Sequence, residues 1–155
     1  MIVAMGSDHA GWRLKDELAE SIRSAGHQVV DLGTSGPASV DYPDFARAVA
    51  EAVAEGQAER GVLLCGSGVG VSVVANKVPG VRAAICHDTY SAHQGVEHDA
   101  LNVLCLGARV IGIELAREIV FRFLDARFTD EARHRRRLDK LLAVERDYTR
   151  TQGNS

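Results

Sequence analysis

The sequence predicts an α/β fold: a three-layer α/β/α sandwich in which a five-stranded parallel sheet lies between two layers of helices. Three observations lead to this prediction. Five short apolar or β-branched runs recur along the chain, stretches with helical periodicity separate them, and the runs are apolar on both faces of the expected strands. Strands of that kind are typical of a parallel sheet that is buried on both sides and joined by right-handed crossovers.

The expected strands each end in a glycine-rich or polar turn. They span residues 2–7, 28–33, 61–66, 82–87 and 102–107. Between them, apolar residues recur at i, i+4 and i+8, which is the spacing of one helix face, and a glycine follows two of these stretches as the expected helix end. The helical sets are Leu14, Leu18 and Ile22 before Gly26; Phe45, Val49 and Val53 before Gly56; and Leu115, Ile119 and Phe123.

A further helix is predicted within residues 129–150, after the last strand and helix of the sandwich. Leu138, Leu141, Leu142 and Glu145 stand there at helical spacing. Because the sandwich is complete without it, we expect this helix to pack outside the core, against a partner subunit. No linker, repeat or low-complexity stretch interrupts the pattern, so residues 1–150 are predicted to form one domain, followed by a polar tail at 151–155.

Composition narrows the possible functions. The chain has 155 residues, of which 46% are hydrophobic and 25% charged, and its net charge of -3 argues against a general nucleic-acid or acidic-membrane binder. The N-terminus has no signal-peptide pattern and no stretch approaches the ~20 apolar residues of a membrane span, so we expect a cytoplasmic protein. The three cysteines lack CxxC spacing, which indicates reduced thiols rather than disulfides or a structural zinc site.

The polar residues that suggest chemistry follow the expected strands. In an open parallel sheet, ligands bind beyond the carboxyl ends of the strands, near the point where the winding direction reverses. We therefore expect the site among residues that end the first four strands. These are Ser7, Asp8 and His9; Asp41, Tyr42 and Pro43; Cys65 to Gly70; and Cys86, His87 and Asp88.

The loop CGSGVG at residues 65–70 fits none of three common glycine-loop or cysteine motifs. A Walker loop, a dinucleotide fingerprint and a cysteine phosphatase would need glycine, glycine and arginine respectively at position 71, where Val71 stands. With these three motifs excluded, the remaining interpretation is a loop that stabilises an anion. Its donors would be the backbone amides around Gly66, Ser67, Gly68 and Gly70. Cys65 lies beside it, where a helix dipole favours the thiolate, and is a candidate base.

A base beside an anion cradle is what the enolisation of a sugar requires. Moving a proton between adjacent carbons needs a base, donors for the enediolate oxygens and cations for any phosphate. Arg133 and Arg137 stand at i and i+4 on the last expected helix and so share a face, and Arg109 follows the fifth strand. These arginines are the candidate phosphate contacts.

Five separated motifs resemble, in order and spacing, the ribose-5-phosphate isomerase type B and galactose-6-phosphate isomerase family. The motifs are SDHAG, DYPDFA, CGSGVGVSVVANKVPGVRAAIC, SAHQGVEHDALNVLCLGARVIG and ARHRRR, and the resemblance covers roughly residues 2–148. It implies a Rossmann-like or flavodoxin-like sheet and an aldose-ketose isomerase that works through an enediolate without a metal or other cofactor. It also implies a homodimer, or a tetramer, with active sites at the subunit interface.

The resemblance also implies roles for individual residues. Cys65 is similar to the base that moves the proton between carbons 1 and 2, Ser67 to the hydroxyl that assists it, and His98 to a histidine of the partner protomer that opens the furanose ring. The implied substrate contacts are the anion hole at Gly66, Gly68 and Gly70; the sugar contacts Asp8 and Tyr42; and the phosphate contacts His9, Arg109, Arg133 and Arg137, some of them across the interface.

Two positions refine this interpretation. One branch of the family has a glutamate base directly after the glycine loop, where this chain has Val71, so the resemblance assigns the chain to the branch with a cysteine base. In many members an asparagine follows the histidine that corresponds to His98, whereas Asp99 stands here. A carboxylate would repel a developing enediolate unless it turned away or paired with a cation, so Asp99 bears on the choice of sugar.

Alternatives stay open at the level of the sequence. Cys86 and Cys105 are expected to be core residues, and Arg135 and Arg136 a solvated surface. Ribose 5-phosphate and ribulose 5-phosphate are the expected substrate pair, with a hexose 6-phosphate or tetrose 4-phosphate as alternative. A non-catalytic module that binds sugar phosphates would need the glycines and arginines but no base.

Overall fold

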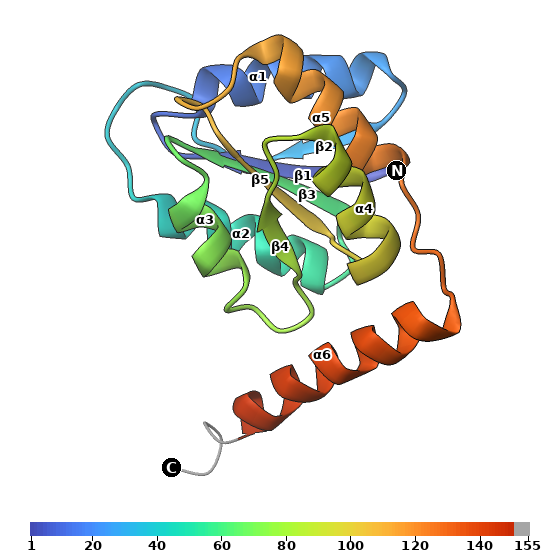
Figure 1. The fold of residues 1–155 in the computed structure, drawn as a ribbon. Coiled ribbons are helices and arrows are strands. Elements are labelled where there is room, and N and C mark those ends of the chain that lie inside the picture. The colour runs from blue at the N-terminus through green and yellow to red at the C-terminus, as the bar shows by residue number, and fades with distance from the viewer. Residues whose placement is uncertain (151–155) are drawn as a thin grey trace.

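The computed structural model describes residues 1–150 of the chain, and the predicted tail at 151–155 lies outside the described residues. Strands and helices alternate along the chain, with a sixth helix at the C-terminal end (Figure 1). In order they are β1 (Ile2–Ser7), α1 (Trp12–Ser24), β2 (Gln28–Asp31), α2 (Tyr42–Ala54), β3 (Arg60–Cys65), α3 (Val69–Ala75), β4 (Ala83–Ile85), α4 (Thr89–Asp99), β5 (Val103–Gly107), α5 (Ile113–Asp125) and α6 (Ala132–Arg150).

The five strands form one parallel sheet in the order β2-β1-β3-β5-β4, which confirms the predicted fold class. The winding direction reverses at β1, because the chain first moves outward to β2 and then returns to place β3 on the other side of β1. The loops that follow β1 and β3 therefore leave the sheet toward opposite faces. Ligands of such sheets bind where the loops diverge in this way, at the carboxyl edge, and this is where the sequence predicts the site.

Two apolar layers hold the sandwich together, one on each face of the sheet. Alternate strand residues point to opposite faces, so Leu64 and Leu106 pack with α1, α4 and α5, whereas Leu63 and Cys65 pack with α2 and α3. The three inner strands, β1, β3 and β5, are almost wholly buried. Truncating a core leucine to alanine in such a layer costs about 2–5 kcal/mol of unfolding free energy.

The ends of the helices follow from local chemistry. Gly26 and Gly56 have φ values of +92° and +76°, the left-handed conformation that commonly ends helices, which places the ends of α1 and α2 where the sequence predicts them. Pro43 lies in the first turn of α2, where a backbone N–H would have no acceptor within the helix, so the missing donor costs no hydrogen bond. The Asp88 carboxylate accepts a hydrogen bond of 2.6 Å from the amide of Ser91 and caps α4.

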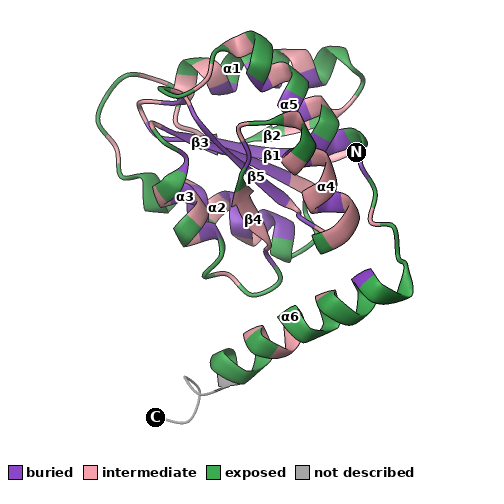
Figure 2. Cartoon of the chain, in the orientation of Figure 1, coloured by how far each residue is buried: buried purple, intermediate pink, exposed green. Residues whose placement is uncertain are grey.

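Helix α6 lies apart from the sandwich, as predicted (Figure 1). It is exposed along most of its length, with one buried position near its beginning (Figure 2). Three of its apolar side chains are largely exposed to solvent: Leu141 is 42% exposed, Val144 59% and Tyr148 75%. A helix that leaves apolar residues uncovered needs a further surface to bury them.

Candidate active site

The loop between β3 and α3 lies on the end of strand β5. Gly68 has a φ of +82°, and a Cβ built on it would lie 3.1 Å from the carbonyl carbon of Leu106. A Cβ built on Gly107 would lie 2.7 Å from the carbonyl oxygen of Ser67. Two hydrogen bonds fix the arrangement, from the amide of Ala108 to the Cys65 carbonyl at 2.8 Å and from the amide of Arg109 to the Gly66 carbonyl at 3.0 Å. The loop conformation therefore depends on glycine on both sides of the contact.

Cys65 is the last residue of β3 and is 5% exposed. Its Sγ accepts a hydrogen bond of 3.1 Å from the amide of Gly68, an interaction that strengthens when the sulfur is anionic. The other two thiols are also buried. Burial, with a smaller effect of the nearby Asp88, raises the pKa of Cys86 to about 11, and burial also raises the pKa of Cys105. Cys86 and Cys105 belong to the apolar core, as predicted, and Cys65 itself is part of the apolar layer that α2 and α3 cover.

The side chain of Ser67 is exposed at the top of the same loop. Its Oγ accepts a hydrogen bond of 3.2 Å from the amide of Val69, the first residue of α3. Helix α3 has only seven residues, so its dipole is that of a short helix and the amides of the loop are the main donors beside Cys65.

Tyr42 and Arg109 approach the glycine loop from two other elements. A Cβ built on Gly70 would lie 2.6 Å from Cε2 of Tyr42, so the phenol ring at the start of α2 packs directly on that glycine. A Cβ on Gly66 would lie 3.5 Å from Cδ and from Nη1 of Arg109. Both side chains remain accessible to a ligand, since Tyr42 is 40% exposed and Arg109 is exposed.

Asp8 and His9 complete the residues at the carboxyl edge. The Asp8 amide donates to the Leu64 carbonyl at 3.2 Å, which joins the ends of β1 and β3. Its carboxylate accepts from the amides of Ala10 at 2.9 Å and Gly11 at 3.2 Å, so Oδ1 is held by the turn that leads into α1. His9 Nδ1 accepts from the Val40 amide at 3.2 Å and ties the segment before α2 to this edge.

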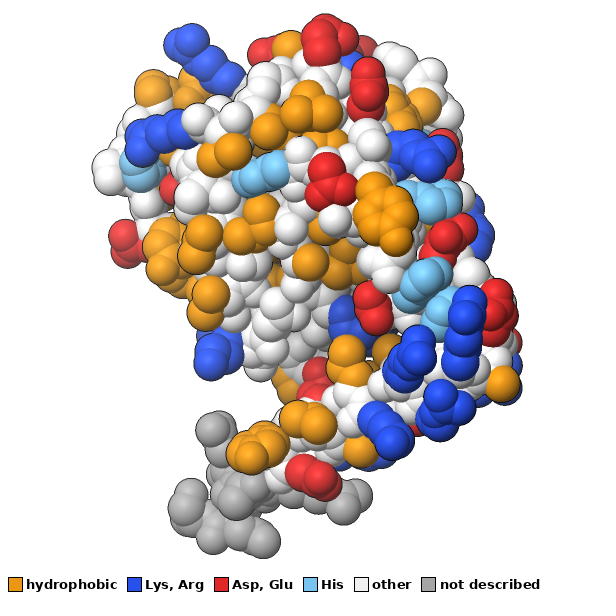
Figure 3. Space-filling model, viewed as in Figure 1, with side chains coloured by type: hydrophobic (Ala, Val, Ile, Leu, Met, Phe, Trp, Pro, Cys, Tyr) orange, Lys and Arg blue, Asp and Glu red, His pale blue; other side chains and the backbone are white. Residues whose placement is uncertain are grey.

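The other four predicted site residues lie elsewhere in the chain. Helix α4 begins at the carboxyl edge and runs back across the sheet, so His98 and Asp99 at its end lie beside the residues that lead into β5. Arg133 and Arg137 lie on the first turns of α6, which contacts α4 (Figure 1). The space-filling view shows histidines and basic side chains gathered where α6 meets the body of the protein (Figure 3).

The predicted site is thus divided into two groups within one chain. The carboxyl-edge group contains the candidate base and the glycine loop: Asp8, His9, Tyr42, Cys65, Gly66, Ser67, Gly68, Gly70 and Arg109. The α4–α6 group contains His98, Asp99, Arg133 and Arg137. Helix α4 connects the two groups within one chain, since it begins at the carboxyl edge and ends at His98 and Asp99.

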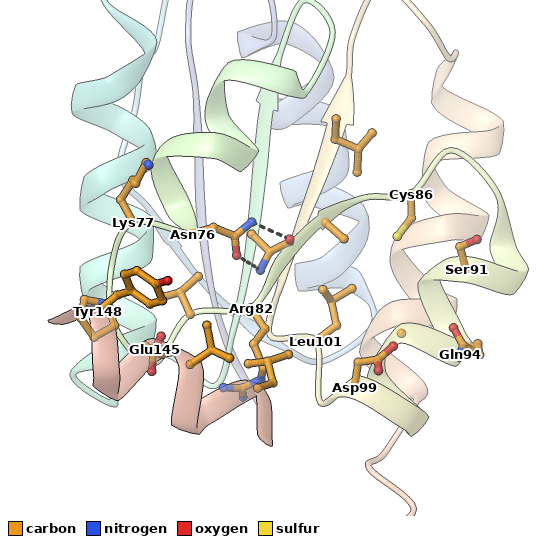
Figure 4. A pocket seen from close by; sticks show the side chains of 18 of the residues that line it. Asn76, Lys77, Arg82, Cys86, Ser91, Gln94, Asp99, Leu101, Glu145 and Tyr148 are labelled. Carbon is orange, nitrogen blue, oxygen red and sulfur yellow. Dashed lines mark hydrogen bonds between the residues drawn. The ribbon is translucent and has the colours of Figure 1, made fainter. Parts of the chain in front are cut away.

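A groove of about 990 Å³ runs between α6 and the edge strand β4. Figure 4 shows Glu145 and Tyr148 of α6 on one side of the groove and Asn76, Lys77 and Arg82 on the other. The Asn76 side chain forms two hydrogen bonds of 2.8 Å with the backbone of Ala83 and so covers part of the free edge of β4. Glu145 accepts from the Gly80 amide at 3.0 Å, which fixes the far part of α6 to the body.

The sequence did not predict two residues that contact His98, Gln94 and His134. Gln94 lies one helical turn before His98, and its amide is 2.8 Å from His98 Nδ1. The ring of His134 stacks on the ring of His98, with centroids 4.0 Å apart. The i, i+4 spacing of Gln94 and His98 would have indicated the first contact if residues 89–99 had been recognised as a helix. The second joins two elements and has no local sequence signal.

Residues 1–150, which the structure describes, contain neither a membrane-spanning helix nor a candidate metal-binding cluster. No helix in this range is both long and apolar enough to cross a bilayer. The same residues hold no cluster of three or more histidine, cysteine or acidic side chains arranged to bind a metal ion.

Comparison with known proteins identifies close relatives of the chain. Residues 3–141 match the sequence model of the family described as Ribose/Galactose Isomerase. The chain is 43% identical over 143 residues to ribose-5-phosphate isomerase B of Escherichia coli, an alignment that covers 92% of this chain and 95% of the relative. It is 45% identical over 128 residues to D-erythrulose-4-phosphate isomerase of Pectobacterium atrosepticum, covering 81% of this chain and 84% of that one.

The solved structures agree with the sequence relatives. The structure of ribose-5-phosphate isomerase B from Clostridium thermocellum superposes on this one with a TM-score of 0.93 and 47% sequence identity, covering 96% of this chain and 99% of the other. Sheet, helices and the extra C-terminal helix are therefore shared over nearly the whole length of both chains.

Proposed function

The chain belongs to the ribose/galactose isomerase family, and on that premise we propose that it interconverts ribose 5-phosphate and ribulose 5-phosphate with Cys65 as the base. The observation that carries the proposal is the hydrogen bond from the Gly68 amide to Cys65 Sγ at the carboxyl end of β3. This bond puts a backbone donor on the sulfur, and a base beside backbone donors is the pairing that proton abstraction next to a carbonyl requires.

The proposed reaction moves one proton between two carbons. The Cys65 thiolate takes the proton from C2 of the open-chain aldose, the C2 electron pair forms a C1–C2 double bond, and the carbonyl oxygen on C1 becomes an enediolate oxygen. Amides of the loop stabilise that charge. The hydroxyl proton on O2 then passes to O1, a transfer that the exposed Ser67 hydroxyl assists. Cys65 returns its proton to C1, which leaves the ketone at C2 and regenerates the thiolate.

The remaining residues receive binding roles in this proposal. Arg109, which lies over Gly66, contributes a cation at the carboxyl edge, and His9, Arg133 and Arg137 complete a phosphate pocket. Tyr42 and Asp8 contact the sugar hydroxyls. His98 opens the furanose ring, and Asp99, an exposed side chain next to it, adjusts the choice of sugar.

We place each complete site at the interface of a homodimer. The division of the site residues into two groups at opposite ends of the sheet supports this arrangement, because the α4–α6 group of one copy can meet the carboxyl-edge group of another. The groove beside α6 and the exposed Leu141, Val144 and Tyr148 offer apolar surface for such an interface. Three free thiols are compatible with the reducing conditions of the cytoplasm, where we expect the enzyme to act.

A tetrose 4-phosphate is the alternative substrate that a specific relative favours, since the Pectobacterium atrosepticum protein acts on D-erythrulose 4-phosphate by its name. A hexose 6-phosphate follows from the galactose in the family description. Measuring kcat/KM for ribose 5-phosphate, erythrose 4-phosphate and galactose 6-phosphate with the same enzyme decides among these three substrates. The proposal expects the highest value for ribose 5-phosphate, and a higher value for either other sugar would reassign the substrate while leaving the isomerase chemistry in place.

A further inference from the structure

His134 has a position that no role proposed above explains. It is the third residue of α6 and is 2% exposed, although the other residues of α6 between 132 and 149 are exposed or half-buried. A polar ring buried at the beginning of a solvent-exposed helix is unusual and needs a partner that justifies the cost of its burial.

The partner of His134 is the imidazole of His98. The two rings are stacked, with centroids 4.0 Å apart and planes inclined by 26°. Nδ1 of His134 lies 2.7 Å from the hydroxyl of Thr129, and the Thr129 amide donates a hydrogen bond of 3.0 Å to the carbonyl of Glu97, the residue before His98. The His134 ring is therefore attached to the last turn of α4 in two ways. Thr129 holds the edge of the ring, and His98 covers its face.

His98 is held on two sides. The His134 ring covers its face, and the amide group of Gln94 lies 2.8 Å from its Nδ1. A glutamine side chain can donate through its nitrogen or accept through its oxygen, so Gln94 can meet Nδ1 whether or not that nitrogen carries a proton. This arrangement orients the ring and leaves Nε2 as the nitrogen that exchanges a proton with a ligand.

Burial and the charges around the stack favour the neutral form of His134. Burial lowers the pKa of His134, and charge on His98, Arg133 and Arg137 acts in the same direction, while Glu131 opposes it. On the α4 side, Glu97 is paired with His93 at 2.9 Å rather than with either stacked ring. A neutral imidazole can face a protonated His98 without repulsion and offers it the electron-rich face of a ring.

We propose that His134 is a positioning residue for His98: its stacked ring holds His98 in the orientation in which Nε2 exchanges a proton with the sugar during ring opening. The inference rests on the proposed function, because it assigns His134 to one step of that reaction. In that step a protonated His98 gives the Nε2 proton to the ring oxygen O4 as the bond between C1 and O4 breaks. The hydroxyl on C1 loses its proton to solvent and becomes the aldehyde carbonyl, so the step leaves His98 neutral.

Only one of the two sugars of the reaction forms a ring, so ring opening can be measured separately from the proton transfer at Cys65. Ribose 5-phosphate closes a five-membered ring through O4 and must be opened. Ribulose 5-phosphate would need O5 to close the equivalent ring from its C2 ketone, and O5 carries the phosphate, so this sugar is always open. Exchange of the C1 hydrogen of ribulose 5-phosphate with deuterium from solvent therefore reports on the enediolate without any ring opening.

The test uses three variants of the full-length enzyme. His134→Ala removes the ring face, His134→Phe retains a ring face without the nitrogen atoms, and Arg135→Ala is a matched control on the neighbouring residue, which is exposed and paired with Asp130. We expect His134→Ala to lower kcat on ribose 5-phosphate about tenfold, with KM and deuterium exchange into ribulose 5-phosphate within about twofold of the parent. We expect His134→Phe to recover most of the lost kcat. An equal loss of conversion and exchange in His134→Ala would overturn the proposal, since it would indicate a general structural role.

A second measurement examines the stack without any catalysis. An NMR pH titration follows the Cε1 proton of His134 in the parent and in His98→Asn. Because charge on His98 is one of the causes that lower the pKa of His134, the midpoint should move upward in the variant. An unchanged midpoint would contradict the pairing. If the parent turned over no sugar phosphate while this shift was observed, the proposed function would fail and the stacked pair would stand.

Discussion

The amide nitrogen of Gly68 lies 3.1 Å from Sγ of Cys65, across the tight turn that ends the central strand β3. The donor is a backbone group, so its direction is fixed by the loop and not by a side-chain rotamer. A preorganised donor of this kind stabilises negative charge without having to move during the reaction. The conformation of Gly68 is therefore as important for the proposed chemistry as the thiol itself.

Replacing Gly68 with alanine should damage this donor. The φ of +82° strains any side chain, and the added Cβ would lie 3.1 Å from the Leu106 carbonyl carbon. We expect Gly68→Ala to lower kcat at least tenfold and to destabilise the fold by about 1–3 kcal/mol. Steady-state kinetics and urea unfolding measure the two effects. Gly36→Ala is the control, because a Cβ there meets nothing within 4 Å, and a Gly68→Ala enzyme as active as this control would refute the role of the loop.

The three cysteines should differ in their reaction with iodoacetamide. Alkylation proceeds through the thiolate, and burial raises the pKa of both Cys86 and Cys105, whereas Cys65 Sγ accepts a hydrogen bond from the Gly68 amide at the carboxyl end of β3. We expect Cys65 to be modified at least about tenfold faster than the other two in the folded protein at pH 7. Peptide mass spectrometry after timed quenching gives the rates. Preferential labelling of Cys86 would contradict the assignment of the reactive thiol.

Stability should depend on pH through His134. Its pKa in the folded protein is lowered by burial and by the charge of His98, so the unfolded chain binds this proton at a higher pH than the folded one. Stability is therefore lost as the pH falls through the unfolded value of about 6.5, and the loss levels off below the folded pKa. Above that range His134 contributes nothing to the dependence.

The variant His134→Phe should lack this part of the pH dependence. Urea unfolding of parent and variant at pH 7.5, 6.5 and 5.5 measures it, and the difference between the two proteins cancels the contributions of the other histidines. We expect the parent to lose more stability than the variant between pH 7.5 and 5.5. Parallel curves for the two proteins would mean that His134 titrates as an exposed histidine does.

A shared active site predicts that two inactive variants restore activity together. Cys65→Ala lacks the base and His98→Asn lacks the ring-opening residue, but a mixed dimer has one site with both residues intact. Random exchange of subunits makes about half of the dimers mixed, each with one working site of two, so about a quarter of the parent activity should return. The assay is conversion of ribose 5-phosphate after unfolding and refolding the mixture. If activity failed to return although mass spectrometry detected mixed dimers, both residues would belong to a site within one chain.

Much of the fold could be predicted from the sequence because it follows from local patterns. The five apolar runs predicted the five strands that the structure contains. The positive φ values of Gly26 and Gly56 confirm the predicted ends of two helices. Helix α4 had no predicted range, and the reason is physical: Ala92 and Val96 are its only buried residues, which is too short a stripe to stand out from a polar sequence.

The site could be predicted only in part. The carboxyl-edge residues follow from the rule that parallel strands bring their ends together, and the loop at Cys65 carries its glycines in sequence. Contacts between elements that are distant in the sequence have no comparable local pattern and could not be predicted. Lys15 is fully buried and bonds Asp31 at 2.7 Å, which secures the turn after β2, yet nothing in the sequence near Lys15 distinguishes it from a surface lysine. The stack of His98 on His134 joins residues of two helices and is visible only in three dimensions.

The central claim is that the Cys65 thiolate is the base of a sugar-phosphate isomerase, and one measurement tests it most directly. Deuterium incorporation at C1 of ribulose 5-phosphate is followed by NMR in D₂O with a metal chelator present, for the parent, Cys65→Ala and the control Cys86→Ala. The account predicts exchange in the parent and in Cys86→Ala, and a loss of about 10²-fold or more in Cys65→Ala. Exchange at the parent rate in a folded Cys65→Ala enzyme would contradict it, because another group would then be removing the proton.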